Sequence, residues 1–463
     1  METIDASRET WGSKFGFIMA AAGSAVGLGN IWRFPYITGE NGGGAFVLIY
    51  IMCVILVGVP LIFTEIGLGR MSKKSPIGAF KDTGASPFWI GVGAVMAIGV
   101  SFFVLAYYAN IAGWTIGYIY KSISGSTESF STFASNPSVT IPLMAAFVLV
   151  TIFIVQLGVS GGIEKAAKIL MPLLFVLIII VAIRGMTLDG AMAGVDFYLN
   201  PDFSKVTANT FLVALGQAFF SMSIGWGIMI TYGSYLPKDA DIVSSGVWVG
   251  FMDAAVALLA GFMIFPAVFA FGKDPAQGQA LVFEILPDIF NSMPGGAIIG
   301  AFFFLLLMIA ALTSSISMLE VPASYFMDEK KWSRKKSAWV VGGLVFLFGL
   351  PASLSWGGNE FFTEMSVSLP WLETPVVGYQ GILDYFWGTF FIVVVALATC
   401  VYVAWKMPIE NIVNELAEGS ESFKEGSVAS NAFVFFIRFV CPIVILAVLL
   451  NMLGIFGIFA GGG

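Results

Sequence analysis

The stretch GSAVGLGN, residues 23–30, lies in the middle of a hydrophobic run that extends over residues 15–38. A second run, 207–236, contains a similar interruption, SMSIGWG at residues 221–227. Each interruption places two closely spaced glycines beside polar residues, and a glycine costs a helix about 1 kcal/mol relative to alanine. We therefore predict that both runs are membrane helices that break near the middle of the bilayer, where a break must line a cavity or bind a ligand.

The composition predicts a protein that crosses the membrane many times. Of the 463 residues, 58% are hydrophobic and only 11% are charged, and the mean hydropathy is +0.90. An ordinary soluble domain has about 25% charged residues. A helix needs roughly 20 apolar residues to cross a hydrocarbon core. About eleven runs reach that length: 15–38, 43–69, 88–122, 139–157, 164–183, 207–236, 241–271, 296–327, 337–355, 384–405 and 430–457.

The residue types that are missing exclude several functional classes. The chain has no histidine and a formal net charge of −7, so we expect no imidazole catalysis, no histidine-bound metal and no nucleic-acid surface. Cys53, Cys400 and Cys441 each lie in an apolar run, which favours neither a disulfide framework nor a metal knuckle. The sequence has no phosphate-binding loop, no GxSxG elbow and no HExxH motif. We therefore predict neither an enzyme nor an ATP-driven pump.

Basic residues predict the orientation in a plasma (inner) membrane. The positive-inside rule favours a cytoplasmic N-terminus, because only Lys121, Arg184, Lys205 and Lys273 then lie outside the cell. Segment 1–14 is predicted to be a cytoplasmic N-terminal segment rather than a secretion signal, since the apolar run after it is too long. The basic residues on the inside are Arg8, Lys14, Arg70, Lys73, Lys74, Lys81, Lys165, Lys168, Lys238, Lys330, Lys331, Arg334, Lys335, Lys336, Lys406, Lys424 and Arg438.

The two interrupted runs each begin a block of about five spans, which predicts one transporter domain made of two repeats, 15–183 and 207–405, followed by a last span at 430–457. A broken helix exposes carbonyls at one end of the break and amides at the other. The carbonyls attract cations, and the amides attract carboxylates. The alternative is that the glycines merely allow close helix packing.

Five longer motifs carry a family resemblance: GSAVGLGNIWRFPY (23–36), ENGGGAF (40–46), GQAFFSMSIGWG (216–227), ITYGSYLPKD (230–239) and ALTSSIS (311–317). They resemble the signature of the neurotransmitter:sodium symporter family, in particular its bacterial amino-acid transporters with the leucine-transporter fold. The resemblance implies an all-α polytopic membrane protein of about eleven helices, with two inverted five-helix repeats and discontinuous helices 1 and 6. It also implies sodium-coupled transport by alternating access, as in other broken-helix carriers.

The resemblance further implies two sodium sites made of hard oxygen ligands, which suit a small hard cation. Thr313 and Ser314 also allow another interpretation, in which their hydroxyls satisfy carbonyls one turn earlier in the same helix. The first sodium site would use Ala25, Asn30, Ser221, Asp253 and the substrate carboxylate. The second would use Gly23, Val26, Ala310, Thr313 and Ser314.

Asp253 is a functional candidate in its own right, because an aspartate in the middle of a membrane span costs several kcal/mol unless it is paired. Chloride-dependent relatives hold an anion in this region. We expect the Asp253 carboxylate to supply that negative charge, beside Tyr50, Gln217 and Ser221. Transport would then be chloride-independent, and protonation of the empty carrier would give proton counter-transport as a hypothesis.

Other side chains resemble the gates and supports of the family. Arg33 and Asp384 correspond to an outer gate pair. Exposed ion pairs contribute only about 0–1 kcal/mol, which suits a gate that must open. The inner pair would be Arg8 and Asp328, with Trp11 and Tyr235 beside it. Structural roles are expected for Glu65, as a partner of amides in the sixth span, and for Gly162 and Pro172, as an element that lets the fifth span unwind or simply kink.

The substrate is expected to carry its own carboxylate, since Gly27 stands where monoamine-transporting relatives have an aspartate. Tyr108 and the amides of Leu28 and Gly29 would hold that carboxylate, and an uncharged wall would accept a neutral, mostly apolar side chain. The large Trp226 should shrink the site and favour small side chains, unless its indole rotates away, so the sequence does not rank small against large apolar side chains. The predicted substrate contacts are Ala25, Leu28, Gly29, Val104, Tyr108, Phe220, Ser221, Ser223, Trp226, Ser317 and Met318.

The sequence thus predicts sodium-coupled uptake of neutral amino acids across a lipid bilayer, with no ATP and no nucleic acid involved. An amino-acid sensor of the same fold, or an ion channel, is the alternative. Polar groups gathered at mid-membrane and at two gates favour a carrier over a channel. A sensor would bind the amino acid without accumulating it, which the sequence alone does not distinguish.

Overall fold

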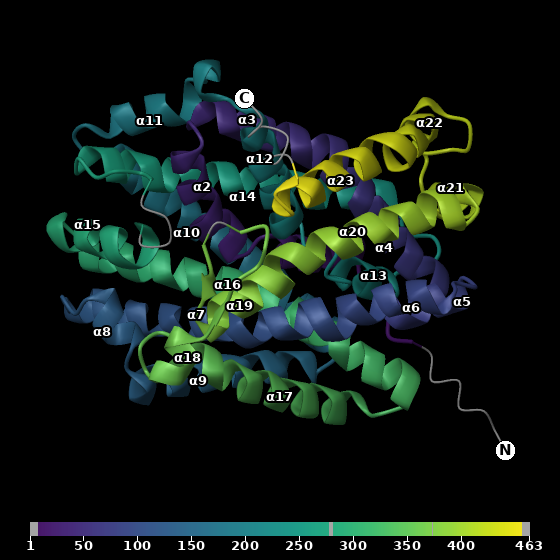
Figure 1. Cartoon of the computed structure of the whole chain (residues 1–463), viewed down its shortest axis with the longest axis horizontal. Coiled ribbons are helices and arrows are strands. Elements are labelled where there is room, and N and C mark those ends of the chain that lie inside the picture. The colour runs from purple at the N-terminus through teal and green to yellow at the C-terminus, as the bar shows by residue number, and fades with distance from the viewer. Residues whose placement is uncertain (1–7, 277–280, 373, 456–463) are drawn as a thin grey trace.

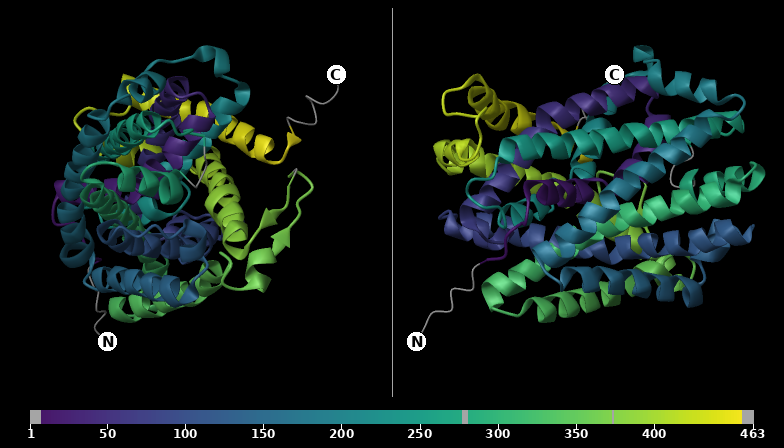
Figure 2. Two further views of the ribbon diagram at one scale, coloured as in Figure 1. Left: turned by 90° about the vertical axis from the view of Figure 1, so that its left-hand side faces the viewer. Right: turned by 180° about the vertical axis from the view of Figure 1, so that it is seen from behind.

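A computed structural model describes residues 8–276, 281–372 and 374–455, so the first seven residues of segment 1–14 and residues 456–457 of the last predicted span lie outside the described residues. The described chain forms a bundle of helices, most of which run roughly along the long horizontal axis of Figure 1. Figure 2 shows the same bundle from its end and from behind.

Within the described residues, nine helices are long and apolar enough to span a membrane. In the first half they are Gly44–Ser72 (α3, Gly44–Cys53; η2, Val54–Gly58; α4, Val59–Ser72), Pro87–Ser124 (α6, Pro87–Ala94; η3, Val95–Val100; α7, Ser101–Ser124), Pro137–Val155 (α9) and Val159–Met186 (η4, Val159–Glu164; α10, Lys165–Met186). In the second half they are Ile242–Ala270 (α14), Gly296–Lys330 (α16), Arg334–Leu354 (α17), Tyr379–Lys406 (α19, Tyr379–Leu383; η7, Asp384–Phe390; α20, Phe391–Val401; η8, Tyr402–Lys406) and Val428–Met452 (α22, Val428–Phe435; η9, Phe436–Val440; α23, Cys441–Met452).

Short elements connect the spans. A two-stranded antiparallel sheet pairs Ser366 with Val377. The short elements are α5 (Pro76–Asp82), α8 (Phe130–Ala134), α11 (Ala191–Leu199), η5 (Phe203–Lys205), η6 (Leu281–Ile285), α15 (Leu286–Ser292), α18 (Glu360–Glu364), β1 (Ser366–Val367), β2 (Val376–Val377) and α21 (Ile409–Ala417).

The first predicted break is present. Helix α1 (Lys14–Ala25) ends before the glycine-rich stretch, and the chain continues as η1 (Gly29–Arg33) and α2 (Phe34–Glu40) at an angle of 48°. No residue of this break has a positive φ. The bend therefore comes from leaving out helical hydrogen bonds, without a left-handed turn.

The second predicted break is also present and is wider. Helix α12 (Ala208–Ser221) and helix α13 (Ile228–Gly233) flank six residues of irregular backbone. Ser223, Gly225 and Gly227 have φ values of 55°, 82° and 74°. Glycine adopts this left-handed region without strain, whereas a serine rarely does. The nine continuous helices and these two broken ones correspond to the eleven predicted runs, and the prediction of which two would break is confirmed.

Both broken helices lie among unbroken ones. Helix α1 packs against α10, α14 and α16, and α13 packs against α4 and α16. A side chain at Gly69 on α4 would collide with the Ile230 carbonyl on α13, and one at Gly233 would collide with the Ile66 carbonyl. Small residues commonly allow such close helix contacts in membranes. The second half of the sixth span is therefore held directly against α4.

Candidate functional site

A buried aspartate joins the first break to α14. Asp253 is fully buried and accepts hydrogen bonds from three side chains. The Asn30 amide and the Ser221 hydroxyl each donate to Oδ1 at 2.7 Å, and the Tyr50 hydroxyl donates to Oδ2 at 3.0 Å. Hydrogen bonds from several donors stabilise a buried carboxylate. Asp253 thus holds together residues from four elements: α3, η1, α12 and α14.

Two of the residues predicted around Asp253 have other partners as well. The Asn30 side-chain oxygen accepts a hydrogen bond from the Gly27 amide at 3.1 Å, so it bridges the break to Asp253. Gln217, which was expected beside Asp253, donates from its Nε2 to the Gly29 carbonyl at 2.8 Å. Gln217 therefore supports the backbone after the first break, because its amide reaches a carbonyl that the broken helix leaves free.

The hydroxyls of α16 behave differently from one another. Ser314 Oγ faces the first break, within 3.2–3.5 Å of the carbonyls of Gly23, Ser24 and Val26. Thr313 Oγ1 donates within its own helix, to the carbonyls of Ile309 at 3.2 Å and of Ala310 at 3.0 Å. Ser314 thus lies among free carbonyls of the break, whereas Thr313 satisfies carbonyls of the preceding turn.

The sixth span's break is supported by an acidic residue from α4. Glu65 is buried, and its Oε1 accepts a hydrogen bond from the Gly225 amide at 2.7 Å. Ser101 at the start of α7 donates to the Trp226 carbonyl at 2.6 Å. An unpaired backbone group would cost several kcal/mol in the membrane interior. These two side chains therefore stabilise the irregular backbone.

A small hollow of about 20 Å³ lies between the two breaks. This is about the free space that one water molecule needs. Tyr108, whose hydroxyl accepts a hydrogen bond from the Leu28 amide at 3.2 Å, borders it. The predicted contacts Val104, Ser221 and Ser317 are buried but do not line it. The described residues that line the hollow are Ser24, Ala25, Gly27, Leu28, Gly29, Tyr108, Phe220, Ser223, Trp226, Ile228, Ser314 and Met318.

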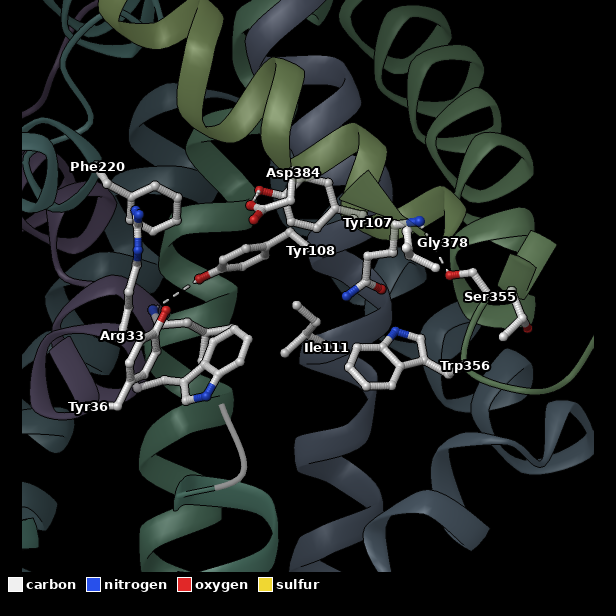
Figure 3. A pocket seen from close by; sticks show the side chains of 16 residues that line it. Arg33, Tyr36, Tyr107, Tyr108, Ile111, Phe220, Ser355, Trp356, Gly378 and Asp384 are labelled. Atoms are coloured by element: carbon white, nitrogen blue, oxygen red, sulfur yellow. Dashed lines mark hydrogen bonds between the residues drawn. The ribbon is translucent and has the colours of Figure 1, made fainter. Parts of the chain in front are cut away.

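A larger cavity of about 430 Å³ lies directly beyond the hollow. Leu28, Tyr108 and Phe220 line both spaces, so these residues separate them. Figure 3 shows Arg33 beside the Phe220 ring and Asp384 beside Tyr107, on different sides of the cavity. We call this end of the bundle, marked by Arg33 and Asp384, the outer end.

The outer pair predicted from the sequence is not joined in this structure. No ion pair connects Arg33 and Asp384 within the described part of the chain. The Arg33 guanidinium lies 4.6 Å from the centre of the Phe220 ring, a favourable cation–π arrangement. Asp384 accepts a hydrogen bond from the Tyr107 hydroxyl at 2.7 Å. Each charge has an aromatic partner, and the cavity stays open between them.

The opposite end of the bundle, marked by Arg8 and Asp328 and called the inner end below, is closed. Arg8 Nη1 and Asp328 Oδ1 form an ion pair at 2.5 Å, and Asp328 Oδ2 also accepts from the Ser75 amide at 2.7 Å. The Arg8 guanidinium lies 4.6 Å from the Tyr235 ring centre, and Trp11 Nε1 donates to the Tyr232 carbonyl at 2.9 Å. The predicted inner pair and both of its aromatic neighbours are therefore brought together.

A second set of charges extends the inner closure. Glu320 is completely buried, and Arg334 pairs with both of its oxygens, at 2.8 and 3.0 Å. Tyr235 donates to Glu320 at 2.5 Å, and Arg334 also pairs with Glu9 at 2.7 Å. Glu9 in turn accepts a hydrogen bond from the Val159 amide at 2.6 Å. These contacts connect the N-terminal segment to the residues that follow α13 and to α16, α17 and η4.

Glu164 holds the N-terminal segment against the fifth span. Its carboxylate accepts from the Gly12 amide at 2.6 Å and the Ser13 hydroxyl at 2.9 Å, and it pairs with Lys168 at 2.5 Å. The predicted Gly162 lies beside Glu164 in η4, while Pro172 lies inside α10. The start of the fifth span is therefore a π-helix tied to the N-terminal segment.

The sequence-based predictions did not include Glu9, Glu164, Glu320 and Arg334. Glu164 and Glu320 carried a usable signal, because each is an acidic residue at the end of a long apolar run. Nothing in the sequence marked Glu9 and Arg334 as functional residues, since charged residues beside membrane spans are common. Only the folded chain shows that these two meet.

The comparison with protein families agrees with this geometry. The family model described as the sodium:neurotransmitter symporter family matches residues 8–129 and 127–457. The chain belongs to this family. The symporter is therefore a multi-pass membrane transporter that depends on sodium, and membership indicates a transporter rather than an enzyme.

Several relatives match almost the whole symporter. The sodium-dependent transporter YhdH of Bacillus subtilis is 38% identical over 455 residues, which cover 94% of this chain and 96% of that protein. A sodium-dependent transporter of Haemophilus influenzae is 37% identical over 468 residues, with coverage of 96% and 98%. The sodium-dependent serotonin transporter of Drosophila melanogaster is 27% identical over 445 residues, with coverage of 84% and 71%.

A solved structure shares the fold. The crystal structure of MhsT in complex with L-phenylalanine superposes with a TM-score of 0.86 and 40% sequence identity. The match covers 96% of the symporter and 100% of the MhsT chain. It supports the all-α polytopic fold with discontinuous first and sixth helices.

Proposed function

We propose that this symporter takes up neutral L-amino acids with small side chains, driven by sodium, through alternating opening of its outer and inner ends. The observation that carries the proposal is the small hollow between two broken helices, with an open cavity on one side and closed ion pairs on the other. The amino acid bound to MhsT supports an amino-acid substrate.

The free amides and carbonyls of the breaks are suited to a zwitterion. Leu28 and Gly29 offer amides near the Tyr108 hydroxyl, where a carboxylate would bind. Phe220 and Ser223 offer carbonyls at the other break for the ammonium group. Gly27 supports the same assignment, because it leaves the first break without an acidic side chain that could replace the substrate carboxylate, and Ser314 Oγ and the Tyr108 hydroxyl lie close to this position.

We assign two sodium ions to the oxygen-rich surroundings of the first break. The first ion would bind near Asp253, Asn30, Ser221 and the Ala25 carbonyl, completed by the substrate carboxylate. The second would bind between Ser314 and the carbonyls of Gly23 and Val26, with Ala310 and Thr313 completing the site. Thr313 would have to turn its hydroxyl away from Ile309, to which it now donates.

Chloride independence forms part of the proposal. Asp253 keeps a fixed negative charge beside Tyr50 and Ser221, at 3.0 and 2.7 Å, so a bound anion would be repelled there. Return of the empty carrier with a protonated Asp253 would export a proton in each cycle. In this scheme the inner end, with the N-terminus, faces the cytoplasm of the cell.

The experiment is uptake of radiolabelled amino acids into proteoliposomes, with a sodium gradient and with chloride replaced by gluconate. We expect accumulation that needs sodium and does not change without chloride. Asn30→Ala should raise the sodium concentration for half-maximal uptake at least several-fold, whereas Asn359→Ala, far from the breaks, should not. Binding without accumulation would instead indicate a sensor, and sodium current without amino-acid uptake a channel.

A further inference from the structure

The Trp226 side chain has an unused hydrogen-bond donor in the central hollow. Trp226 is 3% exposed, and among the described residues no acceptor lies within hydrogen-bond distance of its indole N–H. Its ring lines the hollow and meets the Phe220 ring edge-on, with centres 5.6 Å apart. A buried donor without an acceptor is costly, and a ligand in the hollow that accepts this bond would remove that cost.

Two serine hydroxyls at or beside the hollow have already donated their protons. Ser223 Oγ donates to the Ser24 carbonyl at 3.0 Å, and Ser317 Oγ donates to the Ser314 carbonyl at 2.7 Å. Because the proton of Ser317 is used, the 2.7 Å contact between the Ser24 and Ser317 hydroxyls is donated by Ser24. A hydroxyl has one proton and two lone pairs. Ser24 and Ser223, which line the hollow, therefore offer lone pairs to a ligand, and Trp226 offers a free N–H. The Tyr108 hydroxyl, which also lines the hollow, is assigned to the substrate carboxylate.

One donor and several acceptors match a side chain that both accepts and donates one hydrogen bond. We propose that the preferred substrates are small amino acids with a side-chain hydroxyl, serine or threonine, and that Trp226 determines this preference. This inference rests on the proposed function, since it concerns the same substrate site. It narrows the neutral, mostly apolar side chains expected from the sequence.

Other side-chain classes fit the hollow less well. The lining residues carry no charged side chain, so acidic and basic substrates would be unpaired. Tyrosine also has a hydroxyl, but its ring would need the wall to move much further than the short side chains of serine and threonine would, since the hollow of about 20 Å³ has space for about one water molecule. Alanine and valine match serine and threonine in size and shape, yet they leave the Trp226 N–H without an acceptor unless water remains beside them.

The test compares amino acids that differ only by the hydroxyl. Threonine and valine are one matched pair, and serine and alanine are the other. In sodium-driven uptake into proteoliposomes, we expect the hydroxyl member of each pair to reach half-maximal rate at a concentration at least about tenfold lower. If the two members of each pair reached half-maximal uptake at the same concentration in the wild-type symporter, the inference would be overturned. No sodium-driven uptake of any of the four would overturn the proposed function itself.

Trp226→Phe removes the N–H and keeps a ring in the wall. In this variant we expect threonine and valine to reach half-maximal uptake at similar concentrations, so that the ratio of the two concentrations approaches one. Trp248→Phe is the matched control, because Trp248 is 51% exposed on α14, away from the hollow, and should leave the ratio unchanged. A ratio in Trp226→Phe that stays at its wild-type value would overturn the role of Trp226. If Trp226→Phe is inactive, the wild-type ratios for both pairs decide the substrate preference.

Discussion

The outer and inner ends of the symporter use the same kinds of residues but differ in how the charges are paired. At the outer end, Arg33 and Asp384 lie apart, each with an aromatic partner, and a cavity of about 430 Å³ stays open. At the inner end, Arg8 and Asp328 form an ion pair at 2.5 Å. The N-terminal segment contributes to this difference, because Arg8, Glu9 and Trp11 make contacts at the inner end.

The comparison suggests how the two ends control which side of the membrane is open. An exposed ion pair is worth only about 0–1 kcal/mol, so no single outer contact holds that end in one state. The inner end combines several less exposed charges, and one of them, Glu320, is completely buried. Removing the partner of a buried charge destabilises the folded protein by much more free energy than the intact pair contributes to its stability. Substitutions at the inner end should therefore have larger effects than matched ones at the outer end.

The largest effect is expected for Arg334→Ala. This variant leaves the buried Glu320 carboxylate without its bidentate partner, which costs about 3–5 kcal/mol. We expect the inner end to open, so that a cysteine introduced at buried Thr231 is labelled by a membrane-impermeant thiol reagent from the inner side. The assay uses a background in which Cys53, Cys400 and Cys441 are replaced.

The double variant Arg334→Ala with Glu320→Gln is the control for this prediction. It removes the unpaired charge together with its partner, so labelling at Thr231 should fall back toward the level of the parent. Labelling that stays high in the double variant would show that Arg334 acts through its packing and not through Glu320.

The next largest effect is expected for Asp328→Asn. The substitution weakens the pair with Arg8 and the bond from the Ser75 amide, which together should stabilise the closed inner end by about 1–3 kcal/mol. We expect the labelling rate at Thr231 to rise by roughly tenfold. An unchanged rate would mean that Trp11 and its ring contacts close this end without the ion pair.

A smaller and more local effect is expected for Glu164→Ala. The change frees the Gly12 amide and the Ser13 hydroxyl from their acceptor, at a cost of about 1 kcal/mol. Hydrogen exchange at the Gly12 amide should become several times faster. Glu9→Ala is the matched variant, since it should speed exchange at the Val159 amide and leave Gly12 slow. The same response in both variants would point to general loosening of the segment.

The smallest effect is expected for Asp384→Asn at the outer end. No ionic partner of Asp384 is present among the described residues, and the asparagine oxygen can still accept from Tyr107. Labelling of a cysteine introduced at Ile111 in the open cavity should therefore change by less than about twofold. A large change would show that the outer charges already control access before substrate binds, and the contrast between the two ends would be lost.

The positions of the helices could be predicted from the sequence, because long apolar runs and glycine-rich interruptions are features of local composition. Both breaks occur where GSAVGLGN and SMSIGWG predicted them. The placement of Gln217 beside Asp253 stays a prediction, and the structure adds a contact that the sequence does not specify, from Gln217 Nε2 to the Gly29 carbonyl. That contact depends on which free carbonyl the break happens to place within reach of the side chain.

The sequence by itself determined the class of protein and the two broken helices, since these follow from hydropathy and glycine content. Only the tertiary structure decided which end is open, how Glu9, Glu164 and Arg334 close the inner end, and that no described residue accepts a hydrogen bond from the Trp226 N–H. The physical reason is that a hydrogen bond or ion pair depends on distances between residues far apart in the chain, and no local pattern specifies them.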